Sequence, residues 1–155
     1  FGVGVAGFPE VHPEDFSATG DFDAGMKRYL QFLKKKVETG AHYVVEQMIF
    51  DADLHFRFVD AARSAGIKVP IVPGIMPFQR LEPVQRFIGG RLRISMPAEL
   101  LGTLRGLTPE YQATVAEEYM AAQVRSLLEA GVPGIHFYCM NRSGPTIRVL
   151  QRARS

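Results

Sequence analysis

Four short apolar segments, bounded by glycine, proline or charged residues, most constrain the fold of this chain. They span residues 2–8, 43–50, 69–75 and 134–140 and are rich in β-branched and aromatic side chains. Runs of this length without polar alternation are typical of strands that are buried on both faces. Helical patterns separate these runs. The order therefore predicts repeated βαβ units and a parallel sheet with helices packed outside it.

Helices are expected wherever apolar side chains recur at three- and four-residue spacing. The predicted helices span residues 23–38, 53–65, 83–88, 97–106, 108–130 and 145–154. The longest has Thr108 as its N-cap and Pro109 at its first position, which is a good helix start. Residues 11–22 are the longest stretch without such a pattern, and we expect an irregular loop there.

The size and composition limit the class of protein. The chain has 155 residues, which suits one domain or about four βα units, half of an eight-stranded barrel. Its net charge of +2 does not indicate a nucleic-acid surface, and no apolar run approaches the length of a membrane span. The single cysteine, Cys139, rules out an intrachain disulfide and fits a reducing, cytoplasmic setting.

A glycine pattern at the start of the chain superficially matches the dinucleotide-binding sequence GxGxxG. Its glycines at residues 2–7 lie inside the first strand-like run, and no helix begins directly after them. That fingerprint requires a strand, a tight turn and a helix start, so we do not assign it here. An open sheet and half of a barrel both remain possible from the pattern. The chain starts at Phe1 without a methionine, and we expect further sequence upstream.

Polar residues follow the expected strands at their carboxyl ends, where parallel α/β folds place their functional groups. His12 stands between two prolines, and Arg142 directly follows the last strand, where it could bind a carboxylate or phosphate. Glu46 and Gln47 interrupt the second strand, so that one must face the helices and the other the opposite face. Surface ion pairs and structural hydrogen bonds remain the simpler alternatives, and His136 reads as a core histidine. The four histidines show no metal-ligand spacing, so we predict no metal.

Four sequence motifs resemble the methylenetetrahydrofolate reductase family. They are GFPEVHPE at 7–14, LKKKVETGAHYVVEQMIFD at 33–51, PIVPGIMPFQ at 70–79 and HFYCMNR at 136–142. The resemblance implies a (βα)8 TIM-barrel fold of the α/β class, of which residues 1–155 are the C-terminal half. It also implies FAD at the carboxyl ends of the strands. The family moves a hydride from NADH or NADPH to FAD and then to 5,10-methylenetetrahydrofolate, which yields 5-methyltetrahydrofolate.

The resemblance also implies roles for individual residues. Phe8, His12 and Lys36 would bind the FAD cofactor. The folate or nicotinamide substrates would be bound by Gln47, Phe87, Tyr138 and Arg142. The family's proton-donating glutamate has no counterpart in this chain, so no catalytic residue is expected here and the chain alone is expected to be inactive.

Three hypotheses follow for the whole protein. The chain is half of an active reductase, with the other half in the same or another polypeptide. Alternatively, it is a shortened, non-catalytic subunit of a larger assembly, which would allow an organellar location. In the third hypothesis it is half of another flavin barrel, such as a proline dehydrogenase-like enzyme. The expected partners are NAD(P)H, folate and the other half of the barrel, together with further copies of the chain or the subunits of a larger assembly.

Overall fold

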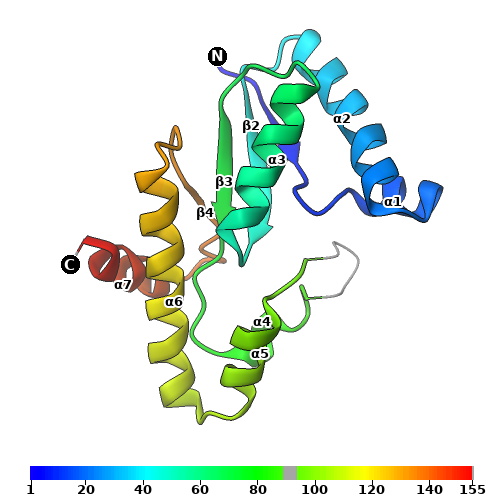
Figure 1. Ribbon diagram of the computed structural model, residues 1–155. Coiled ribbons are helices and arrows are strands. Elements are labelled where there is room, and N and C mark those ends of the chain that lie inside the picture. Colours follow the sequence, from blue (N-terminus) through cyan, green and yellow to red (C-terminus); the bar gives the residue numbers. More distant parts are fainter. Residues whose placement is uncertain (89–93, 155) are drawn as a thin grey trace.

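A parallel sheet forms the centre of the molecule. The computed structural model describes residues 1–88 and 94–154, and within these the sheet has four strands in the order β1-β2-β3-β4 (Figure 1). The strands are β1 (Gly4–Gly7), β2 (Tyr43–Ile49), β3 (Ile71–Ile75) and β4 (His136–Phe137), and every neighbouring pair is parallel. The predicted α/β architecture is therefore confirmed, and the arrangement is consistent with part of a TIM barrel.

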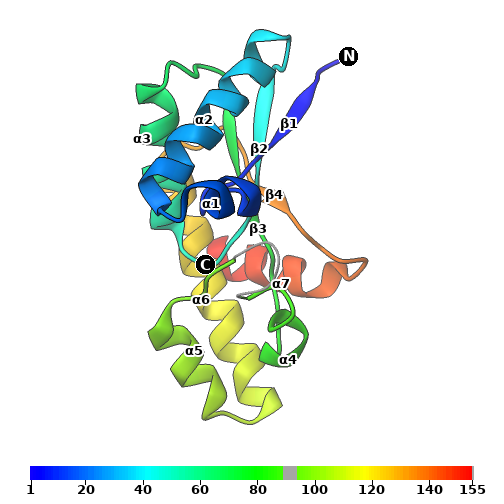
Figure 2. The same ribbon diagram turned by 90° about the vertical axis from the view of Figure 1, so that its right-hand side faces the viewer.

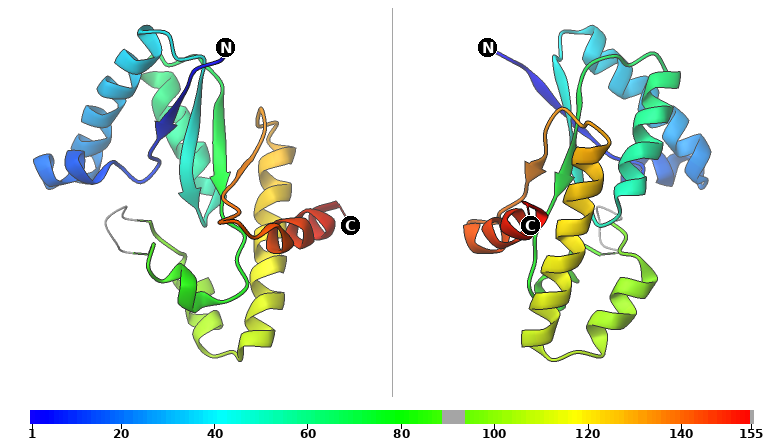
Figure 3. Two further views of the ribbon diagram at one scale, coloured as in Figure 1. Left: turned by 180° about the vertical axis from the view of Figure 1, so that it is seen from behind. Right: turned by 60° about the vertical axis from the view of Figure 1, so that its left-hand side comes forward.

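Helices connect and flank the strands. They are α1 (Pro13–Thr19), α2 (Phe22–Glu38), α3 (Ala52–Ser64), α4 (Leu81–Val84), α5 (Ala98–Arg105), α6 (Pro109–Glu129) and α7 (Ser143–Arg154). The short helices α4 and α5 lie beyond the carboxyl ends of β2 and β3 (Figures 1 and 2). Seen from behind, α2 stands beyond the β1 edge of the sheet, whereas α6 and α7 stand beyond the β4 edge (Figure 3).

Three expectations about the secondary structure were wrong. Residues 11–22 are not an irregular loop, because α1 forms within them: His12 caps its first turn through Nδ1, and Pro13 occupies the first helical position. The last strand is only His136–Phe137, because Met140 and Asn141 adopt positive φ angles of 48° and 59° and turn the chain. The helix expected over 83–88 is instead α4, which ends at Val84, so Phe87 lies in the turn after it.

Buried apolar side chains form two clusters, one toward the amino ends of the strands and one at their carboxyl ends. One joins β1 and the amino-terminal parts of β2 and β3 to α2 and α3, with Leu33, Val44 and Phe58 at its centre. The other joins the carboxyl ends of β2 and β3 to α4, α5, α6 and α7, and includes Phe50 and Met120. Because the second cluster surrounds the strand ends, it holds in place the loops from which a site at that end is built.

Helix α6 is tied to these loops by side-chain hydrogen bonds as well as by packing. The Tyr119 hydroxyl donates to the backbone carbonyl of Phe50, at 2.9 Å, directly after β2. Gln112 Oε1 accepts the backbone N–H of Leu81, at 3.0 Å, where α4 begins. Each bond satisfies a backbone group that no ladder or helix pairs, so α6 fixes both loops against the sheet.

A bulge in β2 sets the geometry of the strand ends. Val45 pairs with Val72 and Met48 with Gly74, so that two β2 residues lie opposite one residue of β3. The Tyr138 hydroxyl, reaching across β3, donates to the backbone carbonyl of Glu46 in this bulge, at 2.9 Å. The ring passes over Gly74, where an added Cβ would lie 2.8 Å from Tyr138 Cε2 and would also collide with the Glu46 carbonyl oxygen. Only glycine allows this approach.

Replacing Gly74 with alanine is therefore expected to destabilise the protein by about 1–3 kcal/mol, the usual cost of overpacking a buried position. The matched control is Gly102→Ala in α5, where an added Cβ meets no atom within 4 Å. That change is expected to stabilise the helix by about 0.5–1 kcal/mol. Urea denaturation of both variants measures the difference, and equal stability of the Gly74→Ala and wild-type proteins would contradict the close approach.

Candidate functional site

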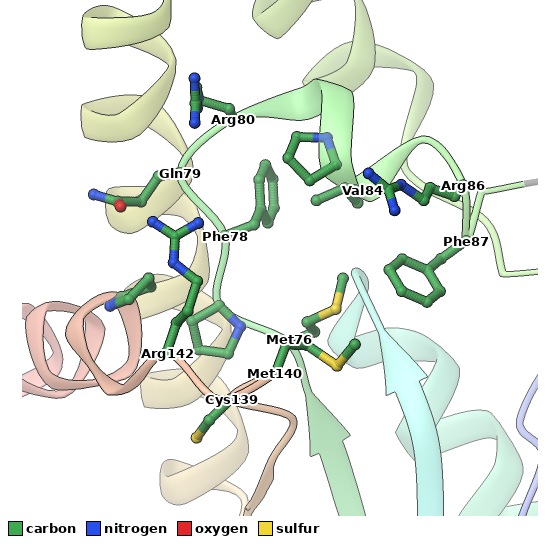
Figure 4. A pocket seen from close by; sticks show the side chains of 13 residues that line it. Met76, Phe78, Gln79, Arg80, Val84, Arg86, Phe87, Cys139, Met140 and Arg142 are labelled. Atoms are coloured by element: carbon green, nitrogen blue, oxygen red, sulfur yellow. The ribbon is translucent and has the colours of Figure 1, made fainter.

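The segments that follow β3 and β4 enclose a cavity at the carboxyl end of the sheet. Its volume is about 220 Å³. Its walls are formed by Met76, Pro77, Phe78, Gln79, Arg80, Pro83, Val84, Arg86, Phe87, Cys139, Met140, Arg142 and Pro145 (Figure 4). Most of these side chains are apolar or aromatic, which suits a flat organic ligand.

Three arginines line the same cavity: Arg80, Arg86 and Arg142. All three are exposed, and no side chain among the described residues forms an ion pair or hydrogen bond with any of their guanidinium groups. No aspartate or glutamate is among the lining residues that the structure describes. The cavity thus combines an apolar wall with uncompensated positive charge, and it favours a ligand with a ring and an anionic group.

A buried carboxylate stands behind the wall and is already neutralised. Glu117 of α6, with an exposed fraction of 4%, accepts hydrogen bonds from Arg148 and Arg152 of α7. Gln79 Nε2 also donates to Glu117 Oε1, at 3.2 Å. Gln79 is a lining residue, so this network fixes one wall of the cavity without bringing negative charge into it.

Aromatic residues gather where β1 ends. The rings of Phe8 and His12 meet edge to face at 4.7 Å, and the Phe8 and Tyr29 rings do so at 5.8 Å. The Tyr29 hydroxyl accepts the N–H of Phe8 and donates to the carbonyl of Ala6. Burial raises the pKa of this phenol well above its usual value, so it stays protonated.

The turn that presents His12 is held in an unusual conformation. Val11, which is fully buried, has a φ of 68°, a left-handed value that β-branched residues rarely adopt. Such a conformation costs on the order of 1–3 kcal/mol and persists where the surroundings enforce it, often at functional sites. His12 Nδ1 accepts the backbone N–H of Glu14, at 3.3 Å, so the ring proton of the neutral imidazole is on Nε2. Half-buried His12 thus has an N–H available for an acceptor.

The two polar residues of β2, Glu46 and Gln47, have different surroundings. Glu46 faces α3, where its Oε1 lies 2.8 Å from His55 Nδ1. The burial pattern of β2, with Glu46 buried and Gln47 half-buried, favours the opposite face for Gln47. Gln47 Oε1 accepts the N–H of Met48, at 2.9 Å, whereas its Nε2 donors have no partner among the described residues. Gln47 therefore presents N–H donors on the face that a barrel would enclose.

Glu46 and His55 form a buried pair with exposed fractions of 0% and 3%. The second carboxyl oxygen, Oε2, is buried and has no hydrogen-bond partner. Burial raises the pKa of the Glu46 carboxyl above its ordinary value of 4.5, and the hydrogen bond and charge of His55 oppose this shift only in part. The pair joins β2 to α3, on the face away from the cavity.

The structure brings some of the predicted site residues together and separates others. Phe87 and Arg142 line one cavity, and Tyr138 lies beside it over the β2 bulge that carries Gln47. Phe8 and His12 are at the end of β1, at the same end of the sheet. Lys36 is not: it lies in the last turn of α2, near the amino ends of the strands (Figure 1). These placements do not test the predicted roles, which remain predictions.

One histidine was misjudged, and two site residues were missed. His136 is exposed and packs edge to face on Tyr138 at 4.6 Å, so it is not a core histidine. Arg80 and Arg86 were not singled out, although both follow the third strand in the segment 76–87. The available sequence signal was only that two arginines follow a strand end, where cations can bind anionic ligands. In the described ranges, no group of His, Cys, Asp and Glu is arranged to hold a metal ion, and no helix is long and apolar enough to cross a membrane.

The parallel α/β architecture is consistent with part of a TIM barrel, and sequence comparison identifies the family. A sequence model described as methylenetetrahydrofolate reductase matches residues 1–154. The chain belongs to the methylenetetrahydrofolate reductase family, which confirms the resemblance seen in the motifs.

Individual relatives agree with this assignment. The chain is 34% identical to methylenetetrahydrofolate reductase (NADH) 1 of Arabidopsis thaliana, over 97% of this chain and 26% of that protein. It is 35% identical to 5,10-methylenetetrahydrofolate reductase of Escherichia coli K12, over 92% of this chain and 46% of the relative. The chain thus spans less than half the length of either relative.

A solved structure resembles the fold at low sequence identity. It is an uncharacterized protein from Clostridium thermocellum that binds two copies of 5-methyl-5,6,7,8-tetrahydrofolic acid. The match has a TM-score of 0.56 and 16% identity, and it covers 99% of this chain and 52% of the other.

The Glu46–His55 pair makes stability depend on pH. Because the pKa of Glu46 is raised on folding, its contribution is fully present below the ordinary value of 4.5 and is lost as the pH rises through the folded-state pKa. Glu46→Gln removes this titration and leaves an amide that can still pair with His55. We therefore expect the melting temperature of Glu46→Gln, relative to wild type, to increase from pH 4.5 to pH 7.5. A relative melting temperature that falls over this range would show that the charged pair is the stabilising form.

Proposed function

We propose that this chain is the C-terminal half of the barrel of an enzyme that reduces 5,10-methylenetetrahydrofolate to 5-methyltetrahydrofolate, with NADH or NADPH as electron donor and FAD as the intermediate carrier. One observation carries the proposal: Phe87, an aromatic wall, and Arg142, an arginine without a partner among the described side chains, line one cavity at the catalytic end of a parallel sheet. A folate combines an aromatic ring system with carboxylates, and this cavity is complementary to both.

The residues at the end of β1 fit a flavin. The Nε2–H of half-buried His12 is suited to donate to a flavin carbonyl or phosphate oxygen, and the edge-to-face Phe8 ring offers an apolar surface beside it. FAD, when bound there, supplies hydride transfer between NAD(P)H and the folate. Lys36, at the opposite end of the sheet, does not share this position. Its contact with the cofactor therefore remains a separate prediction.

We assign the binding of the folate and nicotinamide substrates to the other four predicted residues. Phe87 provides the wall on which the pteridine, benzoyl or nicotinamide ring packs. The Nε2 donors of Gln47 orient the folate ring through its acceptor atoms. The Tyr138 hydroxyl donates its proton to the Glu46 carbonyl. The hydroxyl oxygen of Tyr138 therefore acts as an acceptor for a hydrogen bond from the ligand. Arg142 binds the glutamate carboxylate with its planar fork.

The comparisons support this assignment. The similar proteins from Arabidopsis thaliana and Escherichia coli are named as reductases of methylenetetrahydrofolate, and the Clostridium thermocellum protein binds 5-methyltetrahydrofolic acid, the product of the proposed reaction. The group that protonates the folate is assigned to the first half of the barrel, in the same chain or another. The residues of this half therefore bind and orient the substrates.

In the complete enzyme, with both halves of the barrel present, replacing Arg142 with alanine is expected to raise the apparent KM for the folate about ten- to a hundredfold. Hydrogen bonds to charged groups contribute about 1.5–3 kcal/mol, and about 1.4 kcal/mol corresponds to a factor of ten. Oxidation of NAD(P)H should stay nearly unchanged. Stopped-flow measurement of the two half-reactions separates these effects, and Arg142→Lys should restore only part of the loss because an ammonium lacks the fork.

Arg105→Ala is the matched control, because Arg105 is exposed at the end of α5 and outside the cavity. It should leave both half-reactions unchanged. Equal slowing of both half-reactions by Arg142→Ala, or a lower melting temperature with unchanged folate affinity, would place Arg142 in the scaffold. Complete absence of folate reduction in the wild-type protein with bound flavin would favour a non-catalytic subunit.

Gln47→Ala tests the other polar contact. We expect it to slow the folate half-reaction about tenfold or more and to leave the flavin content of the purified protein unchanged, because the lost donors face the substrate. Flavin absorbance and single-turnover folate reduction report the two effects separately. Normal folate kinetics together with lost flavin would reverse the roles of Gln47 and the His12 turn.

A further inference from the structure

A second cavity lies beside the amino end of β3, between α3 and the turn that joins α6 to β4. Figure 1 shows α3 on one side of β3 and the end of α6 on the other. The cavity has a volume of about 220 Å³ and is lined by His55, Phe56, Val59, Asp60, Arg63, Ile71, Ala130, Gly131, Val132 and Pro133. Its described lining has no residue in common with the first cavity, at the carboxyl ends of the strands. The second cavity is therefore a separate candidate site.

Apolar side chains form much of the wall of the second cavity. Val59 and Val132 are half-buried, and Ile71 is buried, with an exposed fraction of 1%. His55, which also lines the cavity, is held by Glu46, whose Oε1 lies 2.8 Å from His55 Nδ1. An apolar wall with a few polar groups is the usual composition of a small-molecule site. The interior of the second cavity is therefore suited to an aliphatic group.

Arg63 has one edge of its guanidinium group available for a ligand. Its Nη1 donates to the backbone carbonyls of Ile67 and Val69, at 2.7 and 3.0 Å. The remaining donors, on Nε and Nη2, have no partner among the described residues. A carboxylate can accept two parallel hydrogen bonds from such an edge. Because the two carbonyls hold the guanidinium group in place, less conformational entropy is lost when a carboxylate binds it.

Asp60 provides a negative charge next to this positive one. It lies three residues before Arg63 in α3 and lines the same cavity. Residues at this spacing are neighbours on the surface of a helix. The two side chains are exposed and form no ion pair with each other, and the Asp60 carboxylate has no partner among the described residues. A cation and an anion thus stand side by side in the wall of one apolar cavity.

We propose that the second cavity binds a free α-amino acid with a short aliphatic side chain. The carboxylate of the amino acid binds the Nε and Nη2 edge of Arg63, and its ammonium group binds the carboxylate of Asp60. Its side chain packs against Val59, Ile71 and Val132. This site is independent of the proposed reductase reaction, because it uses none of the residues assigned to that reaction.

Ligands with only one of the two charges fit less well. A carboxylic acid without an amino group would bind Arg63 but would bring a second negative charge beside Asp60. An amine without a carboxylate would meet the same difficulty at Arg63. An α-amino acid carries both charges on one carbon atom, which matches two neighbouring side chains of opposite charge. A direct Asp60–Arg63 ion pair would be an exposed one, and such pairs contribute little stability, so it would compete only weakly with the ligand.

The experiment measures the binding of L-leucine to the complete protein by isothermal titration calorimetry. Isocaproate, which lacks the amino group of leucine, and isoamylamine, which lacks its carboxylate, are the matched probes. We expect leucine to bind with a Kd of about 1 mM or tighter. Each probe should bind about tenfold more weakly, because it loses one charge-assisted contact.

Two variants assign the two charges. Asp60→Asn should weaken leucine binding about threefold or more and leave isocaproate binding unchanged or tighter, because only leucine has an ammonium group. Arg63→Lys keeps the charge but lacks the planar fork, so it should weaken leucine and isocaproate by a similar factor. Arg57→Gln is the control: Arg57 is exposed on the same helix and outside the second cavity, and its replacement should change neither affinity.

The inference is overturned if leucine does not bind to the wild-type protein, or if Asp60→Asn leaves the affinity for leucine unchanged. Equal binding of isocaproate and leucine would identify a site for simple carboxylic acids instead. Because Asp60 is exposed and has no partner among the described residues, Asp60→Asn is expected to keep the fold. The test therefore does not depend on the stability of Arg63→Lys, and melting temperatures without ligand confirm that each variant is folded.

Discussion

The hydrogen bond from the Tyr138 hydroxyl to the Glu46 carbonyl is the contact on which the strand ends depend. It connects β4 to β2 across β3, and it satisfies a carbonyl in the bulge where β2 departs from regular pairing. The contact requires the absence of a side chain at Gly74. Because Gln47 lies in the same bulge, this one local irregularity affects both the direction of the Gln47 side chain and the position of Tyr138 beside the cavity.

Helix α6 holds the loops at the carboxyl ends of the strands in place. Its polar side chains pair with backbone groups in the loops after β2 and before α4, and its buried Glu117 binds both α7 and a wall of the cavity. These bonds come from successive turns of one long helix, so the loops are held at fixed distances from one another. Loops positioned by a rigid scaffold are where binding residues usually occur. The shape of the cavity therefore depends on these hydrogen bonds from α6 as well as on the strands.

Sequence periodicity predicted the parallel sheet and most helices because burial on both strand faces and on one helix face leaves a clear pattern. It failed where short-range chemistry overrides the pattern: α1 forms through the His12 cap, and β4 ends early at the Met140 turn. The resemblance to a known family supplied the site residues, and two of these, Phe87 and Arg142, do line one cavity. Arg80 was missed, because whether an arginine lacks a partner depends on residues distant in sequence.

The charge of the cavity follows from where the buried carboxylates point. Glu46 faces α3 and pairs with His55, and Glu117 faces α7 and pairs with two arginines, so both are used on the far sides of the walls. Burying a carboxylate without such a partner costs free energy. Glu46 therefore pairs with α3, and Glu117 pairs with α7. Among the described residues, no carboxylate lines the cavity beside the three arginines. The same pairing that fastens the helices to the sheet thus leaves an electropositive cavity, whose charge favours anionic ligands.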